Sequence, residues 1–314
     1  EYAVRGPIAQ RALEMKKQGQ EVISCNIGNP QALGQPPLTY FRTILSLIEN
    51  PALIARERKI RQLIGNAGSG LKEEDLIQED VLIACERILS TSKTGTGAYT
   101  ESKGFEFVRE AVAKFIDKRD GIKTEGGIPS APEKIFLTNG ASQAVKFVID
   151  ILISDKNDGI MIPIPQYPLY SAEITKSGGT QINYFLNEEQ GWTFNREDLE
   201  EAFSKAVKAG IQPKAIVVIN PGNPTGAILT EACMLETAAF AKDHNLVIIA
   251  DEVYQENVYN GKFTSFAKII GSDPITLCSI HSISKGFIGE CGHRGGYLEV
   301  RNPPQIKGTN LDLV

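Results

Sequence analysis

Lys285 lies in a local sequence that suits covalent chemistry. It is part of residues 282–286 (SISKG), which follow a run of β-favouring residues at 276–280. An amine beside hydroxyl groups and a glycine can form a Schiff base where burial frees its lone pair. An ordinary solvated surface charge fits the same local sequence. The lysine alone therefore leaves both interpretations open.

A carboxylate and a phenol follow another apolar run, at 246–250. Asp251 stands at the expected carboxyl end of that strand, and Tyr254 lies three residues further on. A carboxylate in this position suits a protonated ring nitrogen, and a helix-capping aspartate is the alternative. Asn223 lies in residues 221–226 (PGNPTG), after the run at 215–220. A structural turn alone also explains that segment.

Three further segments suit an anion and a planar ring. Gly140, Ala141 and Ser142 follow the run at 135–138 and precede a helical pattern, as in an anion site at a helix N-terminus. Arg294 lies between glycines, where it can grip an anion with two nitrogens. Tyr167 lies between two prolines and can stack on a ring. The respective alternatives are an ordinary turn capped by Ser142, a surface ion pair and a core aromatic.

Alternating strands and helices must position these residues. Strands are predicted at 135–138, 159–164, 181–186, 215–220, 246–250, 276–280 and 296–300, and helices at 8–17, 104–119, 143–153, 196–209 and 231–244. Asn195 and Thr230 are the expected N-caps of the last two helices. This pattern predicts an α/β fold with a seven-stranded, mainly parallel sheet and helices on both faces. Ligands of such sheets lie beyond the carboxyl ends of the strands, where the motifs above stand.

Composition excludes several other classes of protein. The 314 residues are 42% apolar and 23% charged, with a net charge of −5 and no basic cluster, so neither disorder nor nucleic-acid binding is expected. No apolar stretch approaches the ~20 residues of a membrane span. Five scattered cysteines without a CxxC pair favour a reducing compartment, and the three histidines lack metal-ligand spacing.

Taken together and in this order, the motifs resemble the fold type I pyridoxal-phosphate-dependent aminotransferases, and among them most of all the alanine aminotransferases. The segments that carry the likeness are residues 2–8 (YAVRGPI), 162–172 (IPIPQYPLYSA), 219–226 (INPGNPTG), 250–255 (ADEVYQ) and 282–300 (SISKGFIGECGHRGGYLEV). The likeness spans essentially the whole chain. It implies transamination, with L-alanine and 2-oxoglutarate as substrates. Glutamate–glyoxylate transamination is the nearest alternative.

The resemblance also implies a role for each site residue. Lys285 would form the internal aldimine with pyridoxal 5′-phosphate, and Asp251 would keep the pyridine nitrogen protonated. The phenolic oxygen of the ring would be bound by Asn223 and Tyr254, and the ring face by Tyr167. The phosphate would be bound by Gly140, Ala141, Ser142, Ser282, Ser284 and Arg294. Tyr99 would reach the phosphate from the second subunit of a homodimer, and Gly28 would close over the substrate.

The resemblance predicts two domains. Residues 1–75 are expected to form an N-terminal arm and part of a small domain, and residues 76–314 the large cofactor-binding domain. The family has a further C-terminal portion of the small domain, so an incomplete small domain is expected here. That leaves activity of this chain alone in question and raises the alternative of an inactive cofactor-binding subunit. The expected location is the cytoplasm, or the mitochondrion if a transit peptide precedes Glu1.

Two other chemistries fit less well. Ser282 and Lys285 match the S-x-x-K pattern of acyl-transfer enzymes, but the companion motifs stand in inverted order along the chain. Residues 65–72 (GNAGSGLK) are similar to a phosphate-binding loop, but Leu71 occupies the lysine position and no strand precedes it. No nucleotide, metal, nucleic-acid or membrane partner is expected.

Overall fold

The computed structural model describes residues 6–23, 28, 30–64, 70, 72–92 and 95–304. The chain forms two compact units, one made of Glu1–Pro30 with Val108–Val314 and the other of Gln31–Phe107. These units are defined by packing and differ from the division at residue 75, which stays a prediction. The N-terminal part of residues 2–8, Leu71 and the tail from residue 305 lie outside the described residues.

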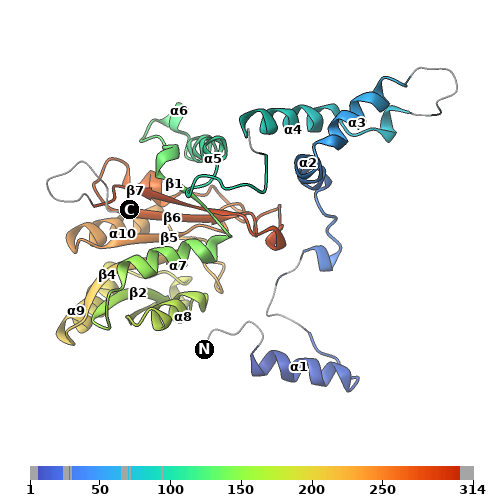
Figure 1. The fold of residues 1–314 in the computed structure, drawn as a ribbon. Helices are drawn as coiled ribbons and strands as arrows, with labels where there is room; N and C mark the ends of the chain where they lie inside the picture. Colours follow the sequence, from blue (N-terminus) through green and yellow to red (C-terminus); the bar gives the residue numbers. More distant parts are fainter. Residues whose placement is uncertain are drawn as a thin grey trace. The chain divides into compact units, whose positions relative to one another are not determined.

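A seven-stranded sheet forms the larger unit (Figure 1). Its strands are β1 (Ile135–Thr138), β2 (Asp158–Ile164), β3 (Thr180–Phe185), β4 (Gln212–Ile219), β5 (Val247–Asp251), β6 (Leu277–Ser282) and β7 (Gly296–Arg301). The strand order is β1-β7-β6-β5-β4-β2-β3, and only β7 runs against its neighbours. The predicted mainly parallel sheet is confirmed. Apolar runs buried on both faces explain why these segments form central strands.

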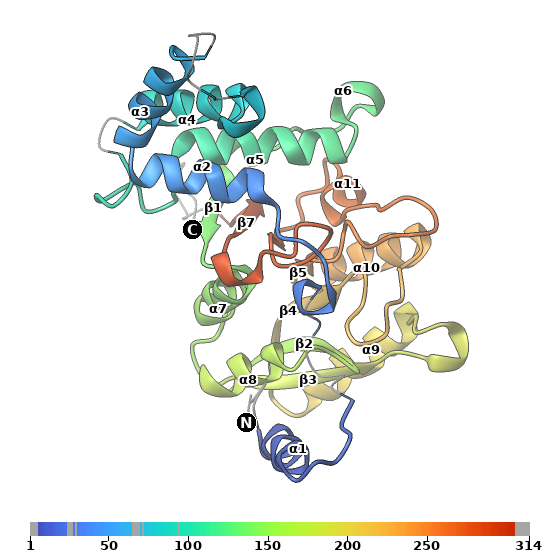
Figure 2. The same ribbon diagram turned by 90° about the vertical axis from the view of Figure 1, so that its right-hand side faces the viewer.

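Helices cover both faces of the sheet, as predicted (Figure 2). The helices α7 (Ala141–Leu152) and α8 (Leu169–Lys176) pack on one face, and α9 (Arg196–Lys208), α10 (Glu231–Asp243) and α11 (Phe266–Ile270) pack on the other. Alternation along β2 separates the two cores: Ile160 and Ile162 face α7 and α8, whereas Met161 faces α9 and α10. This follows from the two-residue period of a strand.

The predicted helix caps are confirmed. The side chain of Asn195 accepts a hydrogen bond from Asp198 N at the start of α9, and Thr230 accepts one from Cys233 N at the start of α10. Gly210 follows α9 with φ +81, a value that favours glycine. The helix α5 (Glu106–Arg119) buries Ala113 and Ile116 against β1 and β7. The remaining elements of this unit are α1 (Pro7–Lys17), α6 (Ile122–Glu125), η3 (Pro132–Lys134), η4 (Glu188–Gln190) and η5 (Cys291–His293).

The smaller unit is helical. It contains α2 (Thr39–Glu49), α3 (Ala52–Arg61) and α4 (Glu79–Thr91), with short turns η1 (Gln31–Leu33) and η2 (Glu73–Asp75). Its core consists of buried Leu47, Ile54, Val81, Leu82 and Cys85. The sequence pattern did not predict these three helices, and none of them has a side chain that caps its N-terminus. Over the described residues, no helix has the length and apolarity to cross a membrane.

Candidate active site

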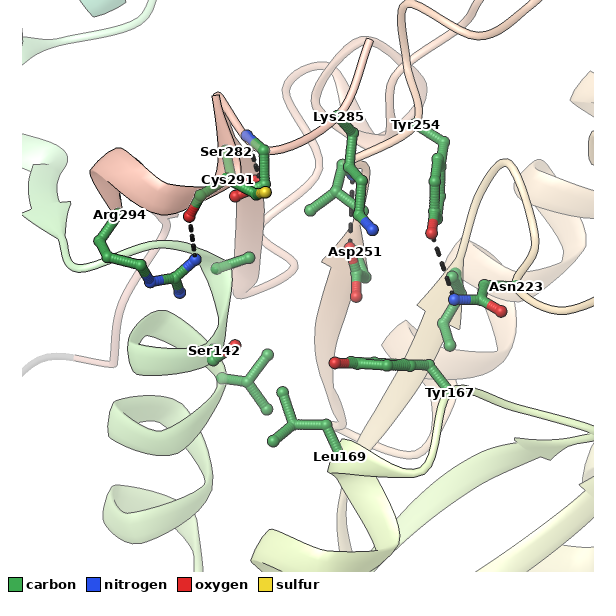
Figure 3. Close-up of a pocket in the computed structure, with 15 residues that line it drawn as sticks. Ser142, Tyr167, Leu169, Asn223, Asp251, Tyr254, Ser282, Lys285, Cys291 and Arg294 are labelled. Atoms are coloured by element: carbon green, nitrogen blue, oxygen red, sulfur yellow. Dashed lines mark hydrogen bonds between the residues drawn. The ribbon is translucent and has the colours of Figure 1, made fainter. Parts of the chain in front are cut away.

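The loops that follow β1, β2, β4, β5 and β6 gather around one pocket of about 170 Å³. This is the edge of the sheet where the carboxyl ends of the parallel strands meet, as expected for an α/β fold. The residues that line the pocket are Ala141, Ser142, Val145, Tyr167, Leu169, Ile219, Asn223, Asp251, Val253, Tyr254, Ser282, Ser284, Lys285, Cys291 and Arg294 (Figure 3). Segments far apart in the sequence thus form a single site.

One end of the pocket is suited to an anion. The N-terminus of α7 opens onto it with Ser142, and Arg294 approaches the same turn from the segment before β7. The Arg294 guanidinium donates to Asn139 O at 3.2 Å and to Cys291 O at 2.9 Å. Gly140 is buried beneath it, and a Cβ there would lie 2.3 Å from Arg294 Nη2. The helix dipole and the guanidinium both favour negative charge at this end.

Asp251 supplies the negative charge of the pocket. Its carboxylate is 5% exposed and accepts hydrogen bonds from Tyr170 Oη at 2.8 Å and from Val253 N at 3.3 Å. Burial raises the pKa of Asp251, while these two hydrogen bonds and the positive charge of Lys285 lower it. Two bonds leave lone pairs of the carboxylate for a further donor.

Lys285, Tyr254 and Asn223 lie beside this carboxylate. Figure 3 shows the Lys285 side chain extending into the pocket between Asp251 and Tyr254. Its Nζ lies 5.3 Å from the centre of the Tyr254 ring, and Asn223 Nδ2 donates to Tyr254 Oη at 3.2 Å. Nearby, Gly286 N donates to the Asn257 side chain at 3.1 Å, which ties the lysine loop to the segment after β5. An amine, a carboxylate and a paired phenol therefore share one site.

Most of the predicted site residues meet in this pocket. Those lining it are Ala141, Ser142, Tyr167, Asn223, Asp251, Tyr254, Ser282, Ser284, Lys285 and Arg294, and Gly140 adjoins them beneath Arg294. Tyr99 belongs to the other unit and is fully exposed, and Gly28 is exposed and is not among the lining residues. The roles of all these residues stay predictions.

Sequence reasoning missed Tyr170, Cys291 and the apolar lining residues. Tyr170 and Cys291 lie within the segments that carried the resemblance, but their residue types gave no separate signal. Burial raises the pKa of Tyr170 well above its usual value, so the phenol remains a hydrogen-bond donor to Asp251.

Glu252 lies on the opposite face of the sheet edge from Asp251. It is 1% exposed, accepts from Phe266 N at 2.7 Å and lies 3.5 Å from Arg119 Nη1. Burial raises its pKa to about 7. His281 Nδ1 lies 3.2 Å from Glu252 O, and burial lowers the pKa of this histidine to about 4, so the ring is neutral at pH 7. This buried cluster supports the strand ends from behind the pocket.

Comparison with known proteins identifies the class. Residues 70–308 match the family described as aminotransferase class I and II. The chain is 44% identical to the probable mitochondrial alanine aminotransferase of Dictyostelium discoideum, over 97% of this chain and 57% of that protein. It is 42% identical to glutamate–glyoxylate aminotransferase 2 of Arabidopsis thaliana, over 97% of this chain and 61% of that protein. The chain thus spans about three fifths of the length of these relatives.

The fold agrees with this assignment. A solved structure of alanine aminotransferase from Pyrococcus furiosus superposes with a TM-score of 0.70 at 24% identity, covering 96% of this chain and 61% of that one. The chain belongs to the class I and II aminotransferases, and the resemblance carried by its motifs is confirmed. Pyridoxal phosphate is the cofactor that this family implies.

The pocket fits that cofactor. Its anion site suits a phosphate, and its aromatic side chain suits a pyridine ring. The buried carboxylate suits the ring nitrogen, the paired phenol suits the phenolic oxygen, and the amine suits the aldehyde. The buried glycine at position 140 adds a specific test, since a Cβ there would occupy the position of the Arg294 guanidinium.

Gly140→Ala is therefore expected to weaken pyridoxal phosphate binding. The added methyl group displaces Arg294, and loss of a charge-assisted contact corresponds to a rise in Kd of about 10- to 100-fold. Fluorescence titration with pyridoxal phosphate measures this Kd. Gly210→Ala is the matched control, because Gly210 also has a positive φ but nothing lies within 4 Å of its Cβ position. Equal Kd values for the Gly140→Ala and unmodified chains would contradict the prediction.

Proposed function

We propose that this chain carries out pyridoxal-phosphate-dependent transamination, most simply between L-alanine and 2-oxoglutarate, which gives pyruvate and L-glutamate. The observation that carries the proposal is the convergence of Lys285, Asp251 and Tyr254 in one pocket with an anion site at its end. The names of the similar proteins support the substrate pair.

Each group of the pocket has a defined task in this proposal. When bound, the cofactor supplies an aldehyde carbon and an electron-withdrawing ring. Lys285 binds at that carbon and moves the proton of the substrate Cα. Asp251 holds a proton on the ring nitrogen, while Asn223 and Tyr254 bind the phenolic oxygen. Tyr167 packs on the ring.

The remaining residues bind the phosphate. They are Gly140, Ala141, Ser142, Ser282, Ser284 and Arg294. A homodimer in which Tyr99 reaches the phosphate of the second subunit is part of the proposal, as is closure of Gly28 over the substrate. Full exposure of Tyr99 is compatible with such a role.

A glutamate–glyoxylate reaction is the second candidate, favoured by the similarity to a protein of that name. The experiment uses the full chain loaded with pyridoxal phosphate. With L-alanine alone, about one pyruvate per site should be released, and 2-oxoglutarate should make release continuous. Faster glycine formation from glutamate and glyoxylate favours the second candidate. Absence of both products would refute transamination and support an inactive cofactor-binding subunit.

We also propose a reducing compartment, in the first instance the cytoplasm. Cys85, Cys233, Cys278 and Cys291 are all free thiols, as is usual in such compartments. The name of the Dictyostelium relative favours the mitochondrion as the alternative. Cell fractionation separates the two.

A further inference from the structure

Tyr170 is a fully buried tyrosine whose hydroxyl reaches the carboxylate of the pocket. It lies in α8, is 0% exposed and donates from Oη to Asp251 Oδ2 at 2.8 Å. The two residues are 81 positions apart in the sequence. A buried phenol needs a partner, and here the partner is the residue assigned to the cofactor nitrogen.

This hydrogen bond fixes the position of one of the two carboxylate oxygens of Asp251. The other oxygen accepts from Val253 N at 3.3 Å, so each oxygen has one fixed donor. Rotation of the carboxylate about its Cβ–Cγ bond would break both bonds. Because a hydroxyl donor favours the ionised form of a carboxylate, Tyr170 opposes the effect of burial on Asp251.

We propose that Tyr170 is a positioning residue, whose hydroxyl holds the Asp251 carboxylate in the orientation and ionised form that bind the protonated ring nitrogen of the cofactor. This inference rests on the proposed function. The alternative is that Tyr170 only fills the core beneath α8, where its ring packs among apolar residues. The positioning role and the core-filling role predict different effects when the hydroxyl alone is removed.

Tyr170→Phe removes the hydroxyl and keeps the ring. Without that donor the pKa of Asp251 rises. The loss of pyridoxal phosphate binding as the pH falls, which is the acid limb of the binding curve, should therefore occur at higher pH. At pH 7 the Kd should rise about tenfold, the size expected for one hydrogen bond to a charged group. Fluorescence titration from pH 5 to pH 9 measures both quantities without turnover.

Tyr184→Phe is the matched control. Tyr184 is 1% exposed and donates to Val217 O at 2.7 Å, and its ring packs in the core on the opposite face of the sheet. Loss of its hydroxyl should lower stability while the Kd and the acid limb remain as in the unmodified chain. Equal changes in both variants, or an unshifted acid limb in Tyr170→Phe, would overturn the proposal.

A second comparison uses Asp251→Asn. In that background no carboxylate remains to be ionised, so Tyr170→Phe should change Kd by less than about twofold. An undiminished tenfold effect there would show that the hydroxyl acts elsewhere and would overturn the proposal. If the unmodified chain binds the cofactor but releases no pyruvate, the proposed function fails while these binding data still decide the role of Tyr170. A chain that binds no pyridoxal phosphate refutes both.

Discussion

Lys285→Ala is expected to reduce pyruvate formation from L-alanine by about 10⁴-fold or more, because the proposed function gives this one side chain both the attachment of the cofactor and the transfer of a proton. Lys285 is the only lysine among the described residues that line the pocket. Its neighbours are a buried carboxylate and the Tyr254 ring, so no other amine of the lining can replace it. The assay is pyruvate release in a single turnover at saturating L-alanine.

Covalent attachment of the cofactor tests the role of Lys285 independently of turnover. Reduction with borohydride should fix the cofactor to the peptide that carries Lys285, and mass spectrometry should find no such label in the alanine variant. Lys262→Ala is the control, since that side chain is 73% exposed and pairs with Glu125 on the surface. Equal labelling of the two variants would show that the attachment site is another lysine.

Local sequence was enough to predict the sheet and its main helices. The strands β4 and β5 contain apolar runs rich in β-branched residues, with Asn220 after the first and Asn245 before the second, and these signals act within a few residues. The caps at Asn195 and Thr230 are equally local. The helices α2 and α4 were not predicted, and the residues before them, Leu38 and Gln78, provide no capping hydrogen bond.

The site was predictable in part for a topological reason. Parallel strands bring their carboxyl ends to one edge, so Asp251, Asn223 and Lys285 had to meet once the strands were assigned. The bond between Tyr170 and Asp251 was not predictable, because it joins a helix to a strand end and depends on how α8 packs. Tyr99 illustrates a further limit, since its predicted role in a second subunit would leave no trace within one chain.

Asp251→Asn tests the electrostatic part of the mechanism. The amide keeps the shape of the side chain but has one acceptor oxygen in place of two, so the change removes the charge and one of the two hydrogen bonds accepted from Tyr170 Oη and Val253 N. Loss of one preorganised charge is expected to slow pyruvate formation by about 10²- to 10³-fold. Labelling of Lys285 by borohydride should persist, because attachment does not require the carboxylate. Stopped-flow measurement of the half-reaction with L-alanine gives the rate.

Glu252→Gln is the matched control for Asp251→Asn. Glu252 is the next residue, is equally buried and faces away from the pocket toward Phe266 and Arg119. Burial raises the pKa of Glu252 to about 7, so the uncharged glutamine is a mild replacement for this side chain. Its variant should therefore keep a rate within about threefold of the unmodified chain, as expected for a residue away from the reacting atoms. If Glu252→Gln slowed the half-reaction as much as Asp251→Asn, the effect would come from disruption of the strand end, and the charge of Asp251 would lose its assigned role.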